Sequence, residues 1–245
     1  MKKHLFIFMI FATAIVFAFL ACKKETKPEP LPPPPTPAID PSVIDAKNVR
    51  NSIDEIAHAA AIVHFYDYVN EITNSDVIAK GEFKNNGFKL TLPPYVRDGI
   101  LVSMDMFEFE NDFDFDISFI LDLIEVNPPE AKGTRASITA LDEEENAIGY
   151  FQYKGVNDLG TKQVVASYVY VDRAVSIKGN YSNSFNNVEV ALLFDCSLKK
   201  GWNIVYRVMD VSITPLSTTF TITAKRPSDI TWYWEFSGSV LQLEI

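Results

Sequence analysis

Short runs of β-branched and aromatic residues, separated by turn signals, follow one another from residue 78 to residue 236. Val, Ile, Tyr, Phe and Thr favour extended strands, whereas Gly, Pro, Asn and Asp interrupt them. Many short strands with no repeat period are typical of an all-β domain. We therefore expect an antiparallel β-sandwich, with a β-barrel as the alternative. The expected strands are 78–83, 88–92, 99–109, 113–126, 135–141, 147–154, 164–172, 174–179, 188–197, 202–213, 218–224 and 230–236.

Turn chemistry places several strand ends. Asn85-Asn86-Gly87 predicts a hairpin turn because Asn and Gly tolerate positive φ, and the acidic segment 142–146 predicts a second hairpin. Asn127-Pro128-Pro129 breaks the chain again. It marks the point at which residues 40–245 would divide if they form two subdomains.

Residues 40–62 carry a different pattern. Asp40-Pro41-Ser42 is suited to capping a helix, and apolar residues then recur at spacings of three to five. This predicts one short helix over 48–61. An extended strand over 58–68 is the competing interpretation.

The N-terminus predicts export. Met1-Lys2-Lys3 is cationic, and residues 5–20 are apolar apart from Thr13 and carry no charge. These features are the n-region and h-region of a signal peptide, which we place over residues 1–21. The apolar run has 16 residues, and a transmembrane helix needs roughly 20, so a permanent membrane span is the less favoured interpretation.

The apolar run ends in Phe19-Leu20-Ala21-Cys22, which resembles the lipobox of bacterial lipoproteins. In that family the cysteine thiol accepts diacylglycerol and the signal is cut just before it. The resemblance implies fatty acyl chains, such as palmitate, on Cys22, and a membrane held through them; two chains suffice for stable anchoring. An ordinary signal peptide with a chance cysteine is the alternative.

Other segments bear on the cellular address. Lys23-Lys24-Glu25 is similar to surface-export signals of lipoproteins from anaerobic Gram-negative bacteria, and no acidic residue stands at the second mature position. Segments 87–93 and 198–203 are similar to parts of uncharacterised lipoproteins from the same bacteria. These resemblances imply an outer-membrane or cell-surface location and bring no known activity.

A proline-rich segment follows the cysteine. Residues 23–37 read KKETKPEPLPPPPTP, a composition that favours extended polyproline II at about 3.1 Å per residue. We interpret residues 22–39 as the lipidated cysteine and its tether, with a reach of roughly 45 Å, and residues 40–245 as the folded β region.

Charge and cysteine content exclude several functions. The formal net charge is −10, or −12 after removal of Lys2 and Lys3, and no basic cluster is present, so we expect no nucleic-acid partner. Only two cysteines occur. With Cys22 lipidated, Cys196 cannot form an internal disulfide. Its apolar surroundings predict a buried thiol rather than a nucleophile.

The segment 107–119 alternates aromatic or apolar residues with carboxylates. A strand would send these two sets to opposite faces. We favour a solvated acidic face over an aromatic core. A calcium site at Asp112, Asp114 and Asp116 and a pair of glycosidase carboxylates are the alternatives. The EF-hand pattern fails because Ile117 stands where glycine is required.

The candidate ligand-binding residues are tryptophans. Trp232 and Trp234 share one face of the expected strand 230–236 with Phe236. Core packing is favoured because each ring buries a large area. An exposed platform for a sugar or peptide is the alternative. Trp202 follows a turn and is the third candidate.

No motif for catalysis survives inspection. The sequence lacks a glycine-rich phosphate loop, HExxH, GxSxG and CxxC, so we expect no cofactor, no metal site and no catalytic residue. We favour a non-catalytic binding or interaction module with a glycan or protein ligand. A carboxylate-based glycan hydrolase and a structural subunit of a surface assembly are the alternatives.

The lipobox assignment makes the first testable prediction. Cys22→Ser should leave the protein without lipid, because serine offers no thiol for a thioether. Metabolic labelling with a fatty acid should mark the wild type and not the variant. A labelled variant would show that the lipid, if any, is carried elsewhere.

Overall fold

Strands make up nearly all of the regular structure in the computed structural model, which describes residues 40–66, 72–104, 124–157, 159–185 and 188–236. Within these residues, the only helical element is the three-residue 3-10 turn η1, Asp98–Ile100. The strands are β1 Val43–Ala46, β2 His58–Tyr66, β3 Ile72–Glu82, β4 Phe88–Thr91, β5 Val102–Ser103, β6 Glu125–Asn127, β7 Lys132–Leu141, β8 Ala147–Val156, β9 Lys162–Val171, β10 Val175–Phe185, β11 Val188–Leu198, β12 Gly201–Ile213, β13 Leu216–Thr223 and β14 Thr231–Glu235.

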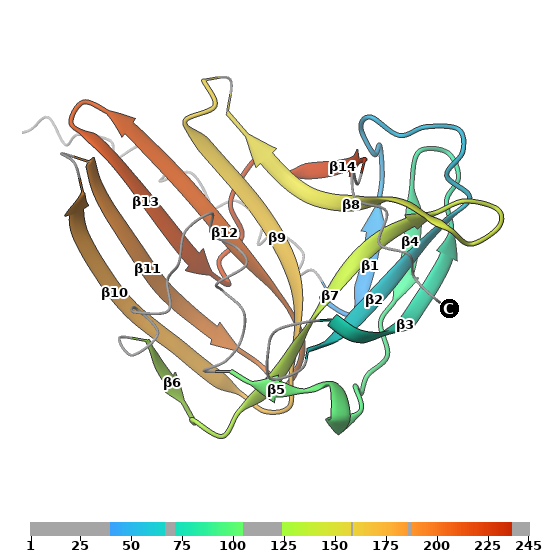
Figure 1. Ribbon diagram of the computed structural model, residues 1–245, viewed down its shortest axis with the longest axis horizontal. Coiled ribbons are helices and arrows are strands. Elements are labelled where there is room, and N and C mark those ends of the chain that lie inside the picture. The colour runs from blue at the N-terminus through green and yellow to red at the C-terminus, as the bar shows by residue number, and fades with distance from the viewer. Residues whose placement is uncertain (1–39, 67–71, 105–123, 158, 186–187, 237–245) are drawn as a thin grey trace, which may run out of the picture. The chain divides into compact units, whose positions relative to one another are not determined.

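The strands form one 12-stranded sheet and one two-stranded sheet. The large sheet runs β3-β2-β7-β8-β9-β12-β13-β11-β10-β6, with β14 attached to β8 and β5 to β7; β1 and β4 form the small sheet (Figure 1). The pairings between named strands are antiparallel except β11–β13, which is parallel. The sheets do not close, so the fold is an all-β sandwich, as the strand pattern predicts.

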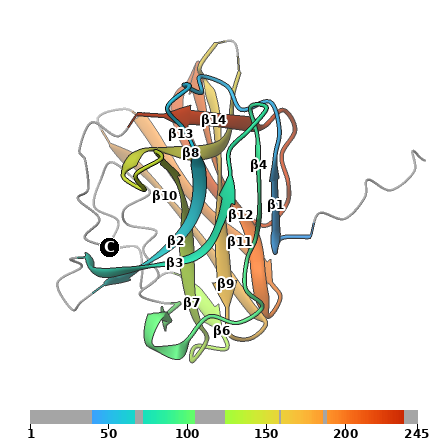
Figure 2. The same ribbon diagram turned by 90° about the vertical axis from the view of Figure 1, so that its right-hand side faces the viewer.

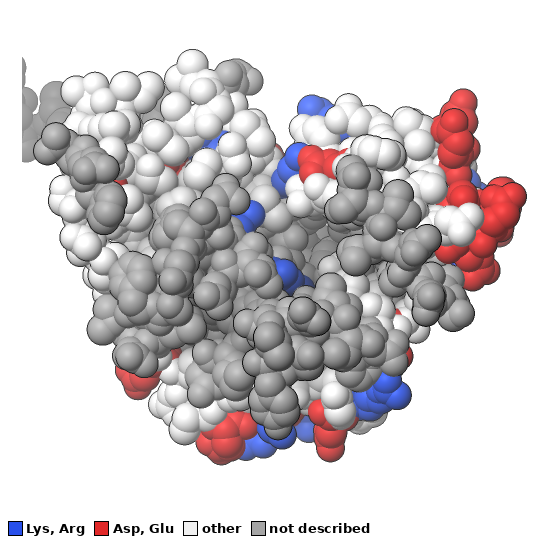
Figure 3. All heavy atoms as spheres, in the orientation of Figure 1, with Lys and Arg blue, Asp and Glu red and all other residues white. Residues whose placement is uncertain are grey.

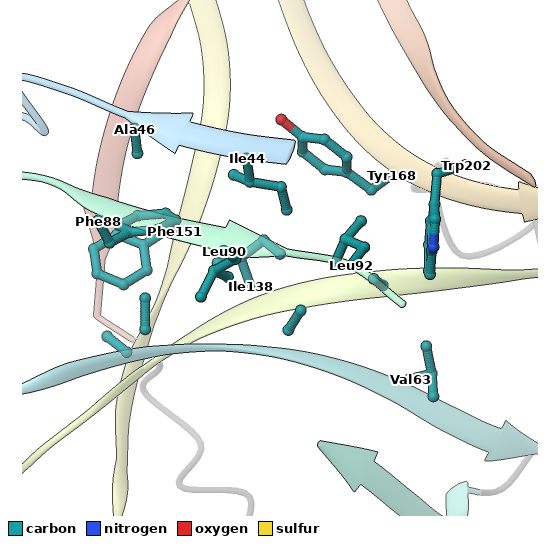
Figure 4. Close-up of a cluster of buried hydrophobic side chains, with 14 of the residues drawn as sticks. Ile44, Ala46, Val63, Phe88, Leu90, Leu92, Ile138, Phe151, Tyr168 and Trp202 are labelled. Atoms are coloured by element: carbon teal, nitrogen blue, oxygen red, sulfur yellow. The ribbon is translucent and has the colours of Figure 1, made fainter. Parts of the chain in front are cut away.

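The small sheet packs on one face of the large sheet, here called the inner face (Figure 2). Ile44, Phe88 and Leu90 of β1 and β4 meet side chains from β2, β7, β8, β9, β12 and β14 in a first hydrophobic core. Figure 4 shows Ile138, Phe151, Tyr168 and Trp202 directed toward this layer. Burial of these large apolar surfaces is the main force that holds the two sheets together.

A second core lies on the opposite face of the large sheet, here called the outer face. Tyr168 and Tyr170 of β9 belong to the first core, whereas Val169 and Val171, between and after them, belong to the second. This is the two-residue alternation of a strand that is covered on both sides. The other members of the second core include Ile177, Leu192, Phe194, Cys196, Val205 and Ile222.

The expected helix over 48–61 does not form. Residues 47–57 contain no regular element and β2 begins at His58, so the competing strand interpretation is correct. Asn48 and Asn51 have φ of 54° and 61°, which a right-handed helix does not allow. Val49 and Ile56 are nevertheless buried in the first core, so a bent segment satisfies the apolar spacing that suggested a helix.

The Asn85-Asn86-Gly87 turn forms, but its two arms belong to different sheets. Asn85 and Asn86 have φ of 53° and 55°, and Lys84 and Gly87 exchange both backbone hydrogen bonds. These are the features of a tight hairpin turn. Beyond the turn, β4 pairs with β1, with Val43 opposite Thr91, while β3 pairs with β2.

Several predictions fall outside the described residues: the signal peptide, Cys22, the tether, most of the strands expected over 99–126, and Asp112, Asp114 and Asp116. None of the helical structure that is described has the length and apolar character to cross a membrane. Strands from both sides of the Asn127-Pro128-Pro129 break join the same large sheet.

Trp232 tests the contribution of the first core. Its side chain is 5% exposed, with the rings of Tyr153 and Phe88 at 5.1 and 5.3 Å. Trp232→Ala should lower the free energy of unfolding by about 3–5 kcal/mol, through lost transfer energy and a cavity. Tyr95→Ala, at an aromatic residue that is 75% exposed, should cost under about 0.5 kcal/mol. Urea unfolding measures both, and equal effects would contradict the burial of Trp232.

Candidate binding site at a strand junction

Three strands separate at one point of the large sheet. The first part of β7 pairs with β9, ending at Ala136 opposite Tyr168, and the second part pairs with β8, beginning at Ile138 opposite Phe151. The second part of β8 pairs with β9, beginning at Tyr153 opposite Ala166. β8 is therefore a wedge between β7 and β9.

One residue of each strand stands at the point of the wedge. Ser137 lies between the two paired parts of β7, Gln152 between those of β8, and Ser167 between Ala166 and Tyr168 on β9. None of the three has a cross-strand partner on the side that faces the junction in these registers. The pairing between these three strands is therefore interrupted at the junction.

The side chains of these three residues point to the outer face. Ala136, Ile138, Phe151 and Tyr168, their neighbours along the strands, are buried in the first core on the inner face, and successive side chains of a strand alternate. The outer face of the junction is thus lined by two hydroxyls and a carboxamide. All three residues are half-buried.

A pocket of about 210 Å³ opens at this junction. Residues of both faces line it, as expected for a gap in a sheet. Apart from the three junction residues, its lining consists of Arg135, Ala136, Ile138, Tyr150, Phe151, Tyr153, Val165, Ala166, Tyr168, Arg207 and Trp232. No aspartate or glutamate is among these described lining residues.

Two arginines give the pocket its charge. Arg135 precedes Ser137 by two residues on β7, so it shares the outer face with Ser137. Arg207 of β12 pairs with Val165 of β9. On the face shown in Figure 3, a few Lys and Arg atoms are visible near the middle, and Asp and Glu atoms gather toward the edges. Both arginines also interact with other residues of the chain.

A neutral histidine lies beside Arg135. Val63 of β2 pairs with Ala136, which puts the next residue, His64, next to Arg135 on the outer face. Burial lowers the pKa of His64, and the positive charge of Arg135 lowers it further. Its Nδ1 lies 2.8 Å from the hydroxyl of Ser75.

A carboxylate that stands opposite a lining residue is already paired. Glu235 of β14 stands opposite Tyr150 of β8, whose hydroxyl donates a 2.9 Å hydrogen bond to it. Lys154 forms a salt bridge with the same carboxylate. This pairing fixes β14 along β8, and none of the described lining residues carries a negative charge.

The three tryptophans named from the sequence occupy different places. Trp232 lines the pocket, but its ring is 5% exposed and lies nearly parallel to Tyr153 and Tyr168, at 5.1 and 6.4 Å. Trp202 is buried in the first core, where its indole N–H donates to the carbonyl of Pro93. Trp234 is partly buried against that core. Neither Trp202 nor Trp234 lines the pocket.

The chemistry of Cys196 is that of a core residue. Burial, with a smaller contribution from the charge of Asp195, raises the pKa of its thiol to about 12. The thiol is therefore protonated at neutral pH, which does not suit a nucleophile. Within the described parts of the chain, no group of three or more His, Cys, Asp or Glu side chains could hold a metal ion.

Sequence reasoning did not find Arg135, Ser137, Gln152, Ser167 or Arg207. They come from four strands, and each fits a strand pattern of alternating polar and apolar residues, so no local signal distinguishes them. The comparisons add no identification: no protein-family model, curated protein or solved structure matches the chain.

The buried thiol yields a further testable prediction. In the Cys22→Ser variant, Cys196 is the only thiol, and iodoacetamide at pH 8 should label it much more slowly in the native protein than in urea, because only the thiolate reacts. Rapid labelling of the native protein would contradict the burial of Cys196.

The raised thiol pKa also fixes the sign of a pH effect. Its contribution to stability is fully present below the unfolded thiol pKa near 8.5 and is lost as pH rises toward the folded value of about 12. Cys196→Ala, compared by urea unfolding between pH 8 and 10, should show a shallower alkaline loss of stability than the parent protein.

Proposed function

We propose that this chain is a membrane-anchored extracytoplasmic lipoprotein whose β-sandwich is a non-catalytic binding module. The location rests on the resemblance of residues 19–22 to a lipobox and on the proline-rich tether, and the outer membrane or cell surface is the address that those resemblances favour. Cys22 would hold the lipid. The tether would place the folded region at a distance from the bilayer.

The observation that carries the binding function is the pocket where β7, β8 and β9 separate. A ligand site is typically a concave, partly apolar space with a few convergent polar groups. Its lining includes Phe151, Tyr153 and Tyr168, which pack in or against the first core on the inner face, and the polar side chains of the junction on the outer face. Its 210 Å³ is below the roughly 300–1,000 Å³ usual for drug-sized ligands, so its ligand is small.

The lining favours binding over hydrolysis. A carboxylate-based glycosidase needs two carboxyl groups about 5–9.5 Å apart across the scissile bond. The described lining offers none, and Glu235 beside it is paired with Lys154 and Tyr150. Tyr168 is no base either, because burial raises the pKa of its hydroxyl well above its usual range.

A pocket-filling variant tests this function. We expect a screen of small sugars, sugar acids, amino acids and dicarboxylates to include compounds that raise the melting temperature of the full-length protein in non-ionic detergent. A ligand at 100 times its Kd stabilises by about 2.7 kcal/mol, or roughly 5–10 °C for a domain of this size. Ser167→Tyr, which places a ring in the pocket, should abolish the shift.

Ser182→Tyr is the matched control, since Ser182 is an exposed residue of β10 outside the pocket lining. It should retain the full ligand-induced shift. If every compound stabilises Ser167→Tyr as strongly as the wild type, the pocket is not the binding site.

A further inference from the structure

We propose that the ligand of this pocket is a small organic acid, recognised through its carboxylate by Arg135 and Arg207. This inference rests on the proposed binding function and adds the chemical class of the ligand. It starts from the charges around the junction. Two arginines are among the residues that line this space, and its described lining contains no carboxylate, in a chain whose formal net charge is −10.

The two arginines approach the pocket from different strands. Arg135 stands opposite Val169 of β9, and Arg207 stands opposite Val165, four residues away on the other side of that strand. Strand rise and spacing then separate their Cα atoms by roughly 16 Å. Both residues line one pocket, and their long side chains project from the outer face by strand alternation, so a small molecule between them can meet both positive charges.

Arginine suits a carboxylate in particular ways. Its planar guanidinium donates two parallel hydrogen bonds to the two oxygens of a carboxylate, and such charge-assisted bonds are stronger than neutral ones. The hydroxyls of Ser137 and Ser167 and the amide of Gln152 add neutral donors and acceptors at the junction. A ligand with one acidic group and further hydroxyl or carbonyl groups would use both sets.

The aromatic residues favour an acid over a neutral sugar. Sugar stacking needs an exposed ring face, and Trp232 is 5% exposed with Tyr153, Tyr168 and Phe88 against it. These aromatic rings therefore pack against one another and offer no open platform. Val165, which shares the outer face with Ser167, gives the body of a ligand an apolar contact, which favours an organic acid over a free inorganic anion.

Competition within the chain limits the affinity. Arg135 and Arg207 have interactions with other residues, which the ligand must share or displace. A ligand of about a dozen non-hydrogen atoms with ordinary efficiency then binds with a Kd on the order of 1 mM.

The test compares D-galacturonate with D-galactose on the full-length protein in non-ionic detergent, by ligand-observed NMR. The two sugars differ by a carboxylate in place of a hydroxymethyl group. We expect galacturonate to bind at least about tenfold more tightly than galactose, and succinate to bind as well. Galactose binding as tightly as galacturonate, or inorganic sulfate binding while neither acid does, would overturn the inference.

Arginine variants assign the charge to the pocket. Arg135→Gln and Arg207→Gln should each weaken galacturonate binding at least about tenfold, because loss of a charge-assisted hydrogen bond has an effect of this size. Arg207→Lys keeps the charge and should lose less. Arg173→Gln, which removes the same charge from an exposed guanidinium paired with Asp172 and Glu130, should leave binding unchanged.

The outcomes separate this inference from the binding function on which it rests. If galactose and galacturonate bind equally and Ser167→Tyr abolishes both, the pocket binds ligands but does not select acids. If galacturonate binds the Ser167→Tyr variant as tightly as it binds the wild type, the inference is wrong and so is the assignment of the binding site to this pocket. The comparison of the two sugars uses only the wild-type protein. It can therefore still refute the inference if the Arg135→Gln variant does not fold.

Discussion

A β-strand has only two hydrogen-bonding edges, and β7 shares each of them between two neighbours. One edge pairs with β5 and then with β2, and the other pairs with β9 up to Ala136 and with β8 from Ile138 onward. This division forces β8 to leave the plane between β7 and β9. The two ladders cannot meet without a gap, so Ser137, Gln152 and Ser167 are left at the junction.

The wedge keeps its position because β14 is built against it. Gly149 and Gly155 of β8 allow the chain to approach closely, since a Cβ on them would lie 2.5 Å from the carbonyl oxygen of Glu235 and 2.4 Å from that of Asp229. On the other side of β14, the backbone of Arg50 bonds to Trp232 and Trp234. The bent segment before β2 therefore holds β14 in place, and β14 in turn pairs with β8 beside the pocket.

Much of the fold was predictable from local pattern. The expected runs 147–154, 188–197, 202–213 and 230–236 correspond closely to β8, β11, β12 and β14, because β-branched and aromatic residues carry their preference with them. The turn at Asn85-Asn86 was also local, since it depends only on residues that accept positive φ. The helix over 48–61 failed because contacts with β14 and the first core outweighed the apolar spacing.

By itself, the sequence determined the all-β class, most strand positions and the burial expected for Cys196, because these depend on composition and on alternation along short segments. The tertiary structure decided which strands pair: the parallel contact of β11 with β13, the pairing of β1 with β4, and the division of β7 between β8 and β9. Pairing depends on the mutual fit of strands far apart in the chain. The pocket and its two arginines exist only because of that fit, which no local segment encodes.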